Sequence, residues 1–310
     1  MEIIRGIHNV RDRHRGCVVT VGNFDGVHHG HRKVLAHLNE KRDALGSAST
    51  LITFEPLPRE FFLGTTMPAR LTRFREKMVL LRDCGIDHVL CLPFNERLAQ
   101  VTATSVIDDF LVGRLAVRYM VVGDDFRFGR GREGDYAMLK AAGERYGFEV
   151  SHIPTFSVDH ERVSSTRIRE VLAEGDVETA SRLLGHDYFI MGRVVQGRRL
   201  GRTLGAATAN IQLKRYRAAV DGVYAVEIDG LDRRYRGIAN IGVRPTVDGQ
   251  TPLLEVHIFD FSGDIYGARL CIVFRKRIRA EQRFPSLDAL KAQIGLDIVA
   301  ARRWFGDARG

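Results

Sequence analysis

Three histidines and a glycine, His28-His29-Gly30-His31, are the residues of this chain whose types and spacing most clearly suggest chemistry. They lie between an apolar run of strand length and a pattern typical of a helix. A strand-to-helix turn offers free backbone N–H groups and the positive end of a helix dipole to a phosphate. Gly26 and Gly30 would let the backbone approach an anion closely, and His28 and His31 could donate hydrogen bonds to a reacting phosphoryl group. We therefore predict a phosphate site here.

Two other interpretations of this motif stay open at the level of sequence. His28 and His31 could bind zinc, although no carboxylate or cysteine in a recognised metal spacing accompanies them. The histidines could also do no more than cap a turn.

A second group of polar residues, Ser164-Ser165-Thr166-Arg167, also falls where a strand gives way to a helix. Hydroxyl groups at a helix start, followed by an arginine, can hold phosphate through side chains and free amides together. A plain helix cap would have much the same sequence.

The C-terminal part carries a cationic loop with glycines at four-residue spacing. Such a loop is suited to wrapping a polyphosphate, although an ordinary hairpin would look similar. Its candidate residues are Gly197, Gly201, Arg202, Thr203 and Gly205.

Thr208 and Asn210 follow this loop and, two residues apart on a strand, would point to the same face. Their side chains offer oxygen ligands of the type that Mg²⁺ accepts. They are therefore candidate metal ligands.

Glu255 belongs to another strand-like segment, LLEVHIFDF. Alternation places Leu254, Val256 and Ile258 on one face of that strand, and Glu255 with His257 on the other. A carboxylate in this position could act as a base or could simply face solvent.

These residues need elements to position them, and residues 1–186 alternate strand-like with helix-like segments. The alternation predicts an α/β domain, a parallel sheet with helices on both faces. Such sheets bind ligands beyond the carboxyl ends of their strands, so DGVHHGH, FEPLP and GDDFRFG should share one rim.

Two further pairs of residues belong near that rim. Asp124 and Asp125 follow a buried strand, where a carboxylate could orient a ribose or a metal-bound water, or could cap a turn. Phe62 and Phe128 could stack on a planar ring, although phenylalanine is more often part of a core.

Beyond residue 186 the segments become short, β-rich and separated by turns, which predicts a small antiparallel β-barrel or sandwich. A terminal helix should follow the N-cap Ser286. Its expected apolar face consists of Leu287, Leu290, Ile294 and Ile298. We predict two domains, residues 1–186 and 187–310.

The formal net charge is +9, and residues 187–310 hold 21 Lys and Arg against 13 Asp and Glu. This excess favours anionic ligands, either phosphorylated small molecules or nucleic acid. Aromatic residues do not alternate with basic ones along the barrel strands as a stacking platform requires, so we expect no nucleic-acid partner.

Four cysteines, with no CxxC pair among them, indicate reduced thiols and a cytoplasmic protein. No apolar run approaches the roughly 18 residues of a membrane span, and the N-terminus is not typical of a secretory signal. We expect no membrane partner.

Longer segments of the N-terminal part resemble a known family. GNFDGVHHGH, TFEPLPREFF, ARLTRFREK, VGDDFRFGRGREGD and SSTRIR are similar to segments of the adenylyltransferase module of bacterial bifunctional riboflavin kinase/FAD synthetases, which belong to the wider HxGH nucleotidyltransferase superfamily with its Rossmann-like fold. The resemblance implies that His28 and His31 contact ATP phosphates, that Mg²⁺ accompanies the nucleotide, and that Phe62, Phe128 and the turn at Asp124-Asp125 lie near the flavin. Other residues expected at the nucleotide or flavin are Gly22, Asn23, Phe24, Asp25, Gly26, Gly30, Ser164, Ser165, Thr166 and Arg167.

The C-terminal part resembles the riboflavin kinase module of the same family, through GRTLG, TANI, GVYA, ANIGVRPT, LEVHIFDF and DIYG. The resemblance implies that Glu255 is the base that takes the proton from the terminal hydroxyl of riboflavin. Arg279 could steady a substrate phosphate through its forked guanidinium, with Arg275 and Arg277 as rival candidates.

Both modules in this order imply a bifunctional enzyme of flavin biosynthesis. One ATP would phosphorylate riboflavin to FMN and leave ADP, and a second ATP would adenylylate FMN to FAD and release pyrophosphate. The alternatives are that only one domain is active, or that the chain is a nucleic-acid-binding protein with a degenerate HxGH domain. We expect a monomer or a weak homo-oligomer.

One departure from the family pattern lies beside the glycine loop. Where these kinases usually have G-F-P-T-A-N, this chain has GAATAN, with Ala206 and Ala207 in place of the Phe-Pro pair. Without the proline, the backbone before Thr208 is less restricted.

Overall fold

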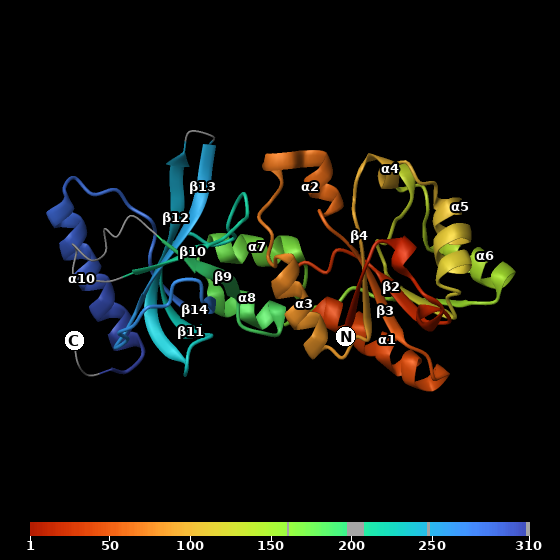
Figure 1. The fold of residues 1–310 in the computed structure, drawn as a ribbon, viewed down its shortest axis with the longest axis horizontal. Coiled ribbons are helices and arrows are strands. Elements are labelled where there is room, and N and C mark those ends of the chain that lie inside the picture. The colour runs from red at the N-terminus through yellow and green to blue at the C-terminus, as the bar shows by residue number, and fades with distance from the viewer. Residues whose placement is uncertain (160, 197–207, 247–248, 308–310) are drawn as a thin grey trace. The chain divides into compact units, whose positions relative to one another are not determined.

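The structure is a computed structural model that describes residues 1–159, 161–196, 208–246 and 249–307 (Figure 1). The chain divides into two compact units, residues 1–67 with 77–163, and residues 68–76 with 164–310. The predicted domain boundary, between residues 1–186 and 187–310, stays a prediction.

The first unit is built on a parallel sheet of six strands in the order β1-β4-β3-β2-β5-β6. This confirms the predicted α/β fold. The carboxyl ends of β2, β3 and β5 lead into the three segments expected at one rim. The strands are β1 (Glu2–Arg5), β2 (Val18–Val21), β3 (Ser49–Phe54), β4 (His88–Leu92), β5 (Tyr119–Gly123) and β6 (Glu149–Ile153).

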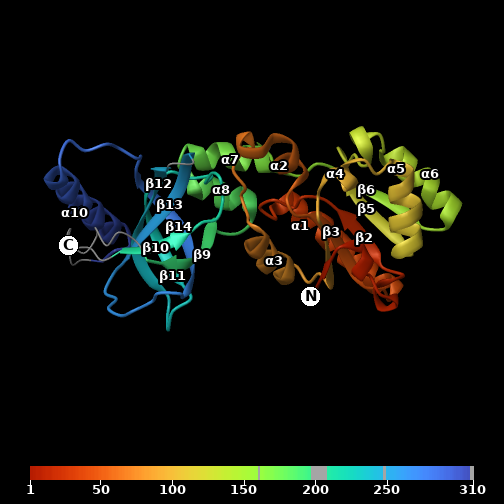
Figure 2. The same cartoon turned by 45° about the horizontal axis from the view of Figure 1, so that its top comes forward.

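Helices cover this sheet because its strands carry apolar side chains on both faces (Figure 2). Helix α1 packs on β2, β3 and β5, with Leu35 and Leu38 fully buried. Ile107, Leu111 and Leu139 belong to a second cluster, which includes Val19 of β2. The helical segments are α1 (His29–Leu45), α2 (Pro58–Leu63), α4 (Glu96–Ala99), α5 (Ala103–Ser105), the π-helical η4 (Val106–Arg114) and α6 (Tyr136–Tyr146).

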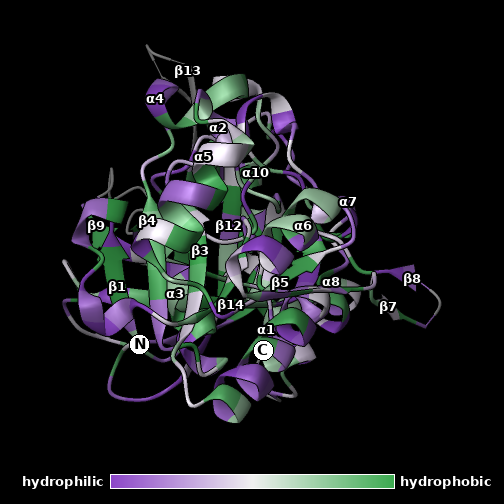
Figure 3. Cartoon of the chain, turned by 90° about the vertical axis from the view of Figure 1, so that its right-hand side faces the viewer, coloured by the Kyte–Doolittle hydropathy of each residue, from purple (hydrophilic) through white to green (hydrophobic). Residues whose placement is uncertain are grey.

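The second unit contains a closed antiparallel barrel in the order β10-β13-β12-β11-β14-β9, which confirms the predicted barrel. In Figure 3 the strands of the sheet and of the barrel are largely hydrophobic, as expected for strands that build cores. The barrel strands are β9 (Phe189–Val195), β10 (Thr208–Gln212), β11 (Gly222–Asp229), β12 (Tyr235–Thr246), β13 (Gly249–Ile258) and β14 (Arg269–Arg279).

Among the described residues of this unit are the helices α7 (Ser165–Ala173), α8 (Val177–Leu184) and α10 (Leu287–Trp304). Helix α8 packs on β14, and α10 packs on β11 and β12. Ser286 caps α10 as predicted, because its hydroxyl accepts a hydrogen bond from the backbone N–H of Ala289. Leu287, the first residue of the helix and one of its expected apolar residues, is 70% exposed.

Residues 68–76 are held in the second unit by a buried ion pair. Nη2 of Arg215 lies 2.9 Å from Oε1 of Glu76, and both side chains are almost fully buried. The same oxygen accepts a hydrogen bond from the backbone N–H of Met191 at 2.8 Å. Helix α3 (Phe74–Asp83) begins in this segment and continues into the first unit.

Candidate active sites

The turn between β2 and α1 has an unusual backbone. Phe24 and Val27 have positive φ angles of 47° and 42°, a conformation that side chains with a Cβ rarely adopt and that is costly for a β-branched valine. Phe24 and Asp25 are buried, and the N–H of Gly22 donates to the carbonyl of Ile52 on the neighbouring strand. The surrounding structure therefore holds this turn in a strained shape, which is common where a ligand binds.

His28 and His31 are brought together at the start of α1. Their rings stack with centroids 3.6 Å apart, and Nδ1 of His28 accepts a long hydrogen bond of 3.4 Å from the N–H of His31. His28 therefore caps the helix, as the capping interpretation expects. Capping does not explain His31, because Nδ1 of His31 is buried and has no hydrogen-bond partner in the described structure.

The environment of His31 also favours a neutral ring. Its pKa lies well below the ordinary value, chiefly because the ring is removed from solvent, and further because His28 and Lys77 would add positive charge beside it. A neutral imidazole with an unsatisfied buried nitrogen is ready to hydrogen-bond a ligand without first losing a proton.

A zinc site at His28 and His31 gains no support. Among the described residues, one group of three potential ligands lies close enough to hold a metal, and it consists of Glu2, His14 and His88. Even there, Nδ1 of His14 accepts the N–H of Arg11 at 3.0 Å, so the ring proton sits on Nε2, which faces Glu2. That tautomer donates to a carboxylate and leaves no lone pair for a metal.

The two aspartates after β5 differ in their surroundings. Oδ2 of Asp124 accepts hydrogen bonds from the backbone N–H and the hydroxyl of Thr155, at 2.7 and 3.3 Å. Asp124 therefore fixes a neighbouring loop. Both aspartates are exposed, and a ligand contact of either one stays a prediction.

The two phenylalanines expected near a flavin lie in different aromatic clusters. Phe62 of α2 is 67% exposed and makes edge contacts with Phe61 and Phe94. Phe128 is half-buried and stacks on Phe126. An exposed ring such as Phe62 is free to cover a planar ligand, whereas Phe128 also packs against the core of its unit.

Ser164-Ser165-Thr166-Arg167 starts helix α7, in the second unit. Ser164 is a regular N-cap whose hydroxyl accepts the N–H of Arg167 at 3.2 Å. Nη1 of Arg167 lies 3.4 Å from the carboxylate of Glu170. A shared nucleotide between this patch and His28-His31 stays a prediction.

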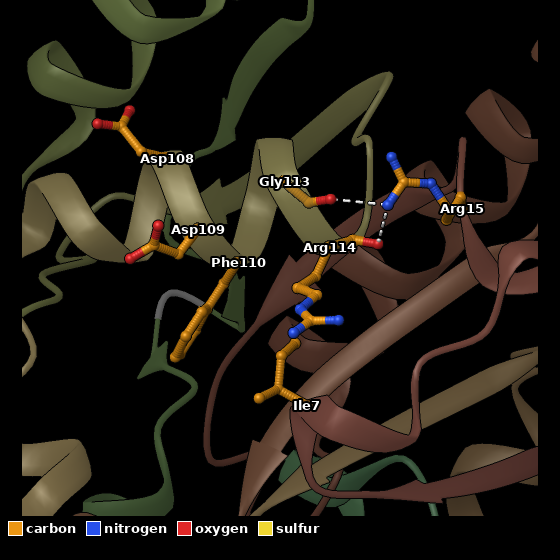
Figure 4. A pocket seen from close by; sticks show the side chains of 7 residues that line it. All are labelled: Ile7, Arg15, Asp108, Asp109, Phe110, Gly113 and Arg114. Carbon is orange, nitrogen blue, oxygen red and sulfur yellow. Dashed lines mark hydrogen bonds between the residues drawn. The ribbon is translucent and has the colours of Figure 1, made fainter.

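A hollow of about 490 Å³ in the first unit contains none of the predicted site residues (Figure 4). Arg15 on its wall donates to the carbonyls of Gly113 and Arg114, at 2.7 and 3.0 Å. The arginine caps the C-terminal end of η4, a structural task that needs no ligand.

In the barrel, strand pairing brings the expected kinase residues into one row. Asn210 of β10 is directly paired with Glu255 of β13, and Thr208 is paired with His257. Directly paired residues point to the same face, so the two candidate metal ligands and the candidate base share a surface. Leu254 and Val256 lie on the other face and are fully buried, as predicted.

The same row contains a residue that the sequence analysis did not select. Asn240 of β12 is paired with Glu255 from the opposite side, so the carboxylate lies between the positions of two asparagines. Nothing in the segment ANIGVRPT indicates that this asparagine takes part in a reaction. Only the register of three strands reveals its place.

The candidate arginines of β14 all have acidic partners. Arg279 makes a double hydrogen bond to Asp297 of α10, and Arg277 binds Asp221. Arg275 contacts Asp187 and Glu227. A phosphate role for Arg279 stays a prediction, and it would have to compete with its bond to Asp297.

The remaining predicted residues, Gly197, Gly201, Arg202, Thr203 and Gly205, lie outside the described residues, as do Ala206 and Ala207.

Two family models of known proteins match this chain, one in its N-terminal part and one in its C-terminal part. A family model described as FAD synthetase matches residues 10–167, and one described as riboflavin kinase matches residues 184–305. Together they account for most of the sequence.

Full-length relatives carry both names at once. A bifunctional riboflavin kinase/FMN adenylyltransferase from Escherichia coli (strain K12) is 50% identical over 308 residues, with 99% of this chain and 98% of that protein covered. Proteins of the same description from Pseudomonas fluorescens and Haemophilus influenzae are 50% and 46% identical, and each comparison covers at least 97% of both chains.

A crystal structure of a protein from Streptococcus pneumoniae, described as a macrolide-efflux protein, matches with a TM-score of 0.84 at 29% identity. It covers 97% of this chain and 99% of that chain. We take from it only the fold, which extends over the same length.

Proposed function

This chain belongs to the family of bifunctional riboflavin kinase/FMN adenylyltransferases, and we propose that each activity has its own site, at Glu255 in the barrel and at His28-His31 beyond the parallel sheet. It phosphorylates riboflavin to FMN and adenylylates FMN to FAD, with ATP as co-substrate in both reactions. The observation that carries the proposed sites is that each of these groups lies in the part matched by the corresponding family model.

In the kinase reaction, Glu255 accepts the proton of the 5′-hydroxyl of riboflavin. The hydroxyl oxygen forms a bond to the γ-phosphorus of ATP while the bond from that phosphorus to the β,γ-bridging oxygen breaks, and ADP leaves. Asn210 lies beside Glu255 on the neighbouring strand and can orient the carboxylate or the phosphate. Positioning of this kind provides much of the rate enhancement in phosphoryl transfer.

Magnesium fits the oxygen atoms of this face. A hydroxyl from Thr208, an amide oxygen from Asn210 and the nearby carboxylate of Glu255 are hard ligands of the kind that Mg²⁺ prefers. When bound, the ion neutralises phosphate charge. We propose Thr208 and Asn210 as its protein ligands.

In the adenylyl transfer, an oxygen of the FMN phosphate forms a bond to the α-phosphorus of ATP, and the bond to the departing pyrophosphate breaks. Negative charge builds up on the phosphoryl oxygens, and His28 and His31 donate hydrogen bonds there. The unsatisfied Nδ1 of His31 supports this role. Backbone amides at the start of α1 add further donors.

The proposed setting is cytoplasmic, as a monomer or weak homo-oligomer that binds no nucleic acid and no membrane. No helix in the described part of the chain is long and apolar enough to cross a membrane. None of the four cysteines forms a disulfide in the described structure.

The test is to incubate the protein with ATP and Mg²⁺, first with riboflavin and then with FMN, and to separate the flavins by chromatography. FAD from both substrates supports two working sites. FAD from FMN alone, or FMN accumulating from riboflavin alone, would show that only one domain is active, and no new flavin at all would contradict the account.

A further inference from the structure

Lys77 of α3 is fully buried in the first unit, next to the histidine site. Its ammonium donates a 2.6 Å hydrogen bond to the carbonyl of Asn23 and lies 3.4 Å from the hydroxyl of Thr53 on β3. Removing an ammonium group from water is costly, and an apolar residue of similar length would fill the same space. Burial of a lysine here therefore calls for a reason other than packing.

We propose that Lys77 is a positioning residue for adenylyl transfer, which holds the Asn23 carbonyl and thereby fixes the strained turn that seats His31. The inference rests on the proposed adenylyltransferase role of that turn. In this proposal Lys77 does not contact the substrate.

The peptide between Asn23 and Phe24 connects Lys77 to the strained turn. A peptide unit is planar and trans, so fixing the direction of the Asn23 carbonyl also fixes the direction of the Phe24 N–H. Phe24 is the residue with φ of 47°. A hydrogen bond on the neighbouring carbonyl is a direct way to stabilise a conformation that the chain would otherwise leave.

Phe24 in turn contacts His31. The Phe24 ring packs on the His31 ring with centroids 4.8 Å apart, and it also closes over Gly22, where an added Cβ would lie 3.0 Å from the ring. A change at the Asn23-Phe24 peptide would therefore move a ring that sets the place of His31.

The positive charge of Lys77 also affects His31. His28 of the same turn and Lys77 of α3 both act electrostatically on His31. Lys77 contributes to the low pKa of His31, after burial and His28, and so helps to keep the ring neutral. A merely space-filling role for Lys77 would have no such effect.

The test is Lys77→Met, which keeps an unbranched side chain one heavy atom shorter and removes both the donor and the charge. FAD formation from supplied FMN is measured together with riboflavin kinase activity in the same preparation. We expect kcat for FAD formation to fall about 10- to 100-fold, the effect of misplacing a catalytic group, with KM for FMN little changed and kinase activity intact. We also expect NMR titration to show a higher pKa for His31, because one positive neighbour is gone.

A matched control is Lys41→Met on α1. Lys41 also has defined contacts, with its ammonium 4.8 Å from the centre of the Tyr119 ring and 4.0 Å from a Glu149 oxygen, but it is not at the turn. This variant should keep both activities and leave the pKa of His31 unchanged.

Three results would overturn the inference: FAD formation within about twofold of wild type, an unchanged pKa of His31 in Lys77→Met, or loss of both activities with a lower melting temperature. The last would mean that Lys77 only supports folding. Wild-type protein is assayed first, and its failure to make FAD from FMN would instead refute the proposed function.

Discussion

Glu255 is placed by strand register between Asn210 and Asn240, and we assign it the proton transfer of the kinase reaction. Glu255→Gln keeps the shape of the side chain and removes the base. We expect FMN formation from riboflavin to be lost while supplied FMN is still converted to FAD, because adenylyl transfer does not use this carboxylate. A variant that also fails on FMN, with an unchanged circular dichroism spectrum, would refute separate sites.

Asn240 should also matter for the kinase, because it lies across from Glu255 on the strand opposite Asn210. We expect the Asn240 amide to hydrogen-bond the carboxylate, and loss of a hydrogen bond to a charged group typically costs about 1.5–3 kcal/mol, or roughly 10- to 150-fold. We expect Asn240→Ala to lower kinase kcat within this range and leave FAD formation from FMN unchanged. Asn240→Asp would place a second carboxylate beside Glu255, so its kinase kcat should be no higher than that of Asn240→Ala. Normal kinase rates in Asn240→Ala would show that the pairing has no chemical role.

At the scale of elements, the buried pair of Glu76 and Arg215 anchors the start of α3 in the second unit. Glu76→Gln would leave the Arg215 guanidinium buried without its counter-charge, which typically lowers the free energy of unfolding by about 3–5 kcal/mol. Replacing both partners, by Glu76→Gln with Arg215→Met, should cost less. Urea unfolding of the wild type, the two single variants and the double variant measures this coupling. Additive effects would mean that the two side chains do not depend on each other.

The segment before β10 offers a test that rests on sequence alone. Ala206→Phe with Ala207→Pro restores the pair usual in the family. Less backbone freedom before binding should stabilise the ordered loop by about 0.5–1 kcal/mol and lower KM for riboflavin several-fold, with kcat nearly unchanged. An unchanged KM, or kinase activity present only in the restored protein, would show that the two alanines have another effect.

The main elements could be predicted because their patterns are long and clear. Strands such as VVTV and YMVVG are mostly apolar, and residues 254–258 of β13 alternate between apolar and polar, so both the sheet and the face of Glu255 were predictable. Strand β1 was missed because EIIR is short and ends in charged residues. The apolar repeat of the terminal helix could not show that Leu287, in the first turn, is exposed.

The candidate sites were predictable only in part. His28 and His31 are close in sequence, whereas Asn240 depends on pairing between distant strands. Lys77 was overlooked because a lysine beside Glu76 in a helical segment looks like an exposed charged face. Its burial depends on how α3 packs near the turn after β2.

For the whole molecule, we expect the positive charge to serve phosphorylated substrates and not nucleic acid. Residues 187–310 carry most of the excess, which suits phosphorylated substrates. Nonspecific binding to DNA or RNA would weaken steeply with salt. We expect no gel shift at moderate salt, and a persistent shift would favour a nucleic-acid partner.

The central claim is that one chain holds two separate sites that act in sequence. The most direct measurement mixes Glu255→Gln with the double variant His28→Ala and His31→Ala, and follows FAD formed from riboflavin, ATP and Mg²⁺. The double variant loses two donors worth about 3 kcal/mol each, so it should stop at FMN. Neither variant alone should make FAD, and the mixture should, because FMN made by one is adenylylated by the other. The contradicting result would be a mixture that accumulates FMN without FAD, although Glu255→Gln alone converts supplied FMN. Released FMN would then not link the two sites. FAD made from riboflavin by either variant alone would contradict the assignment of its residues.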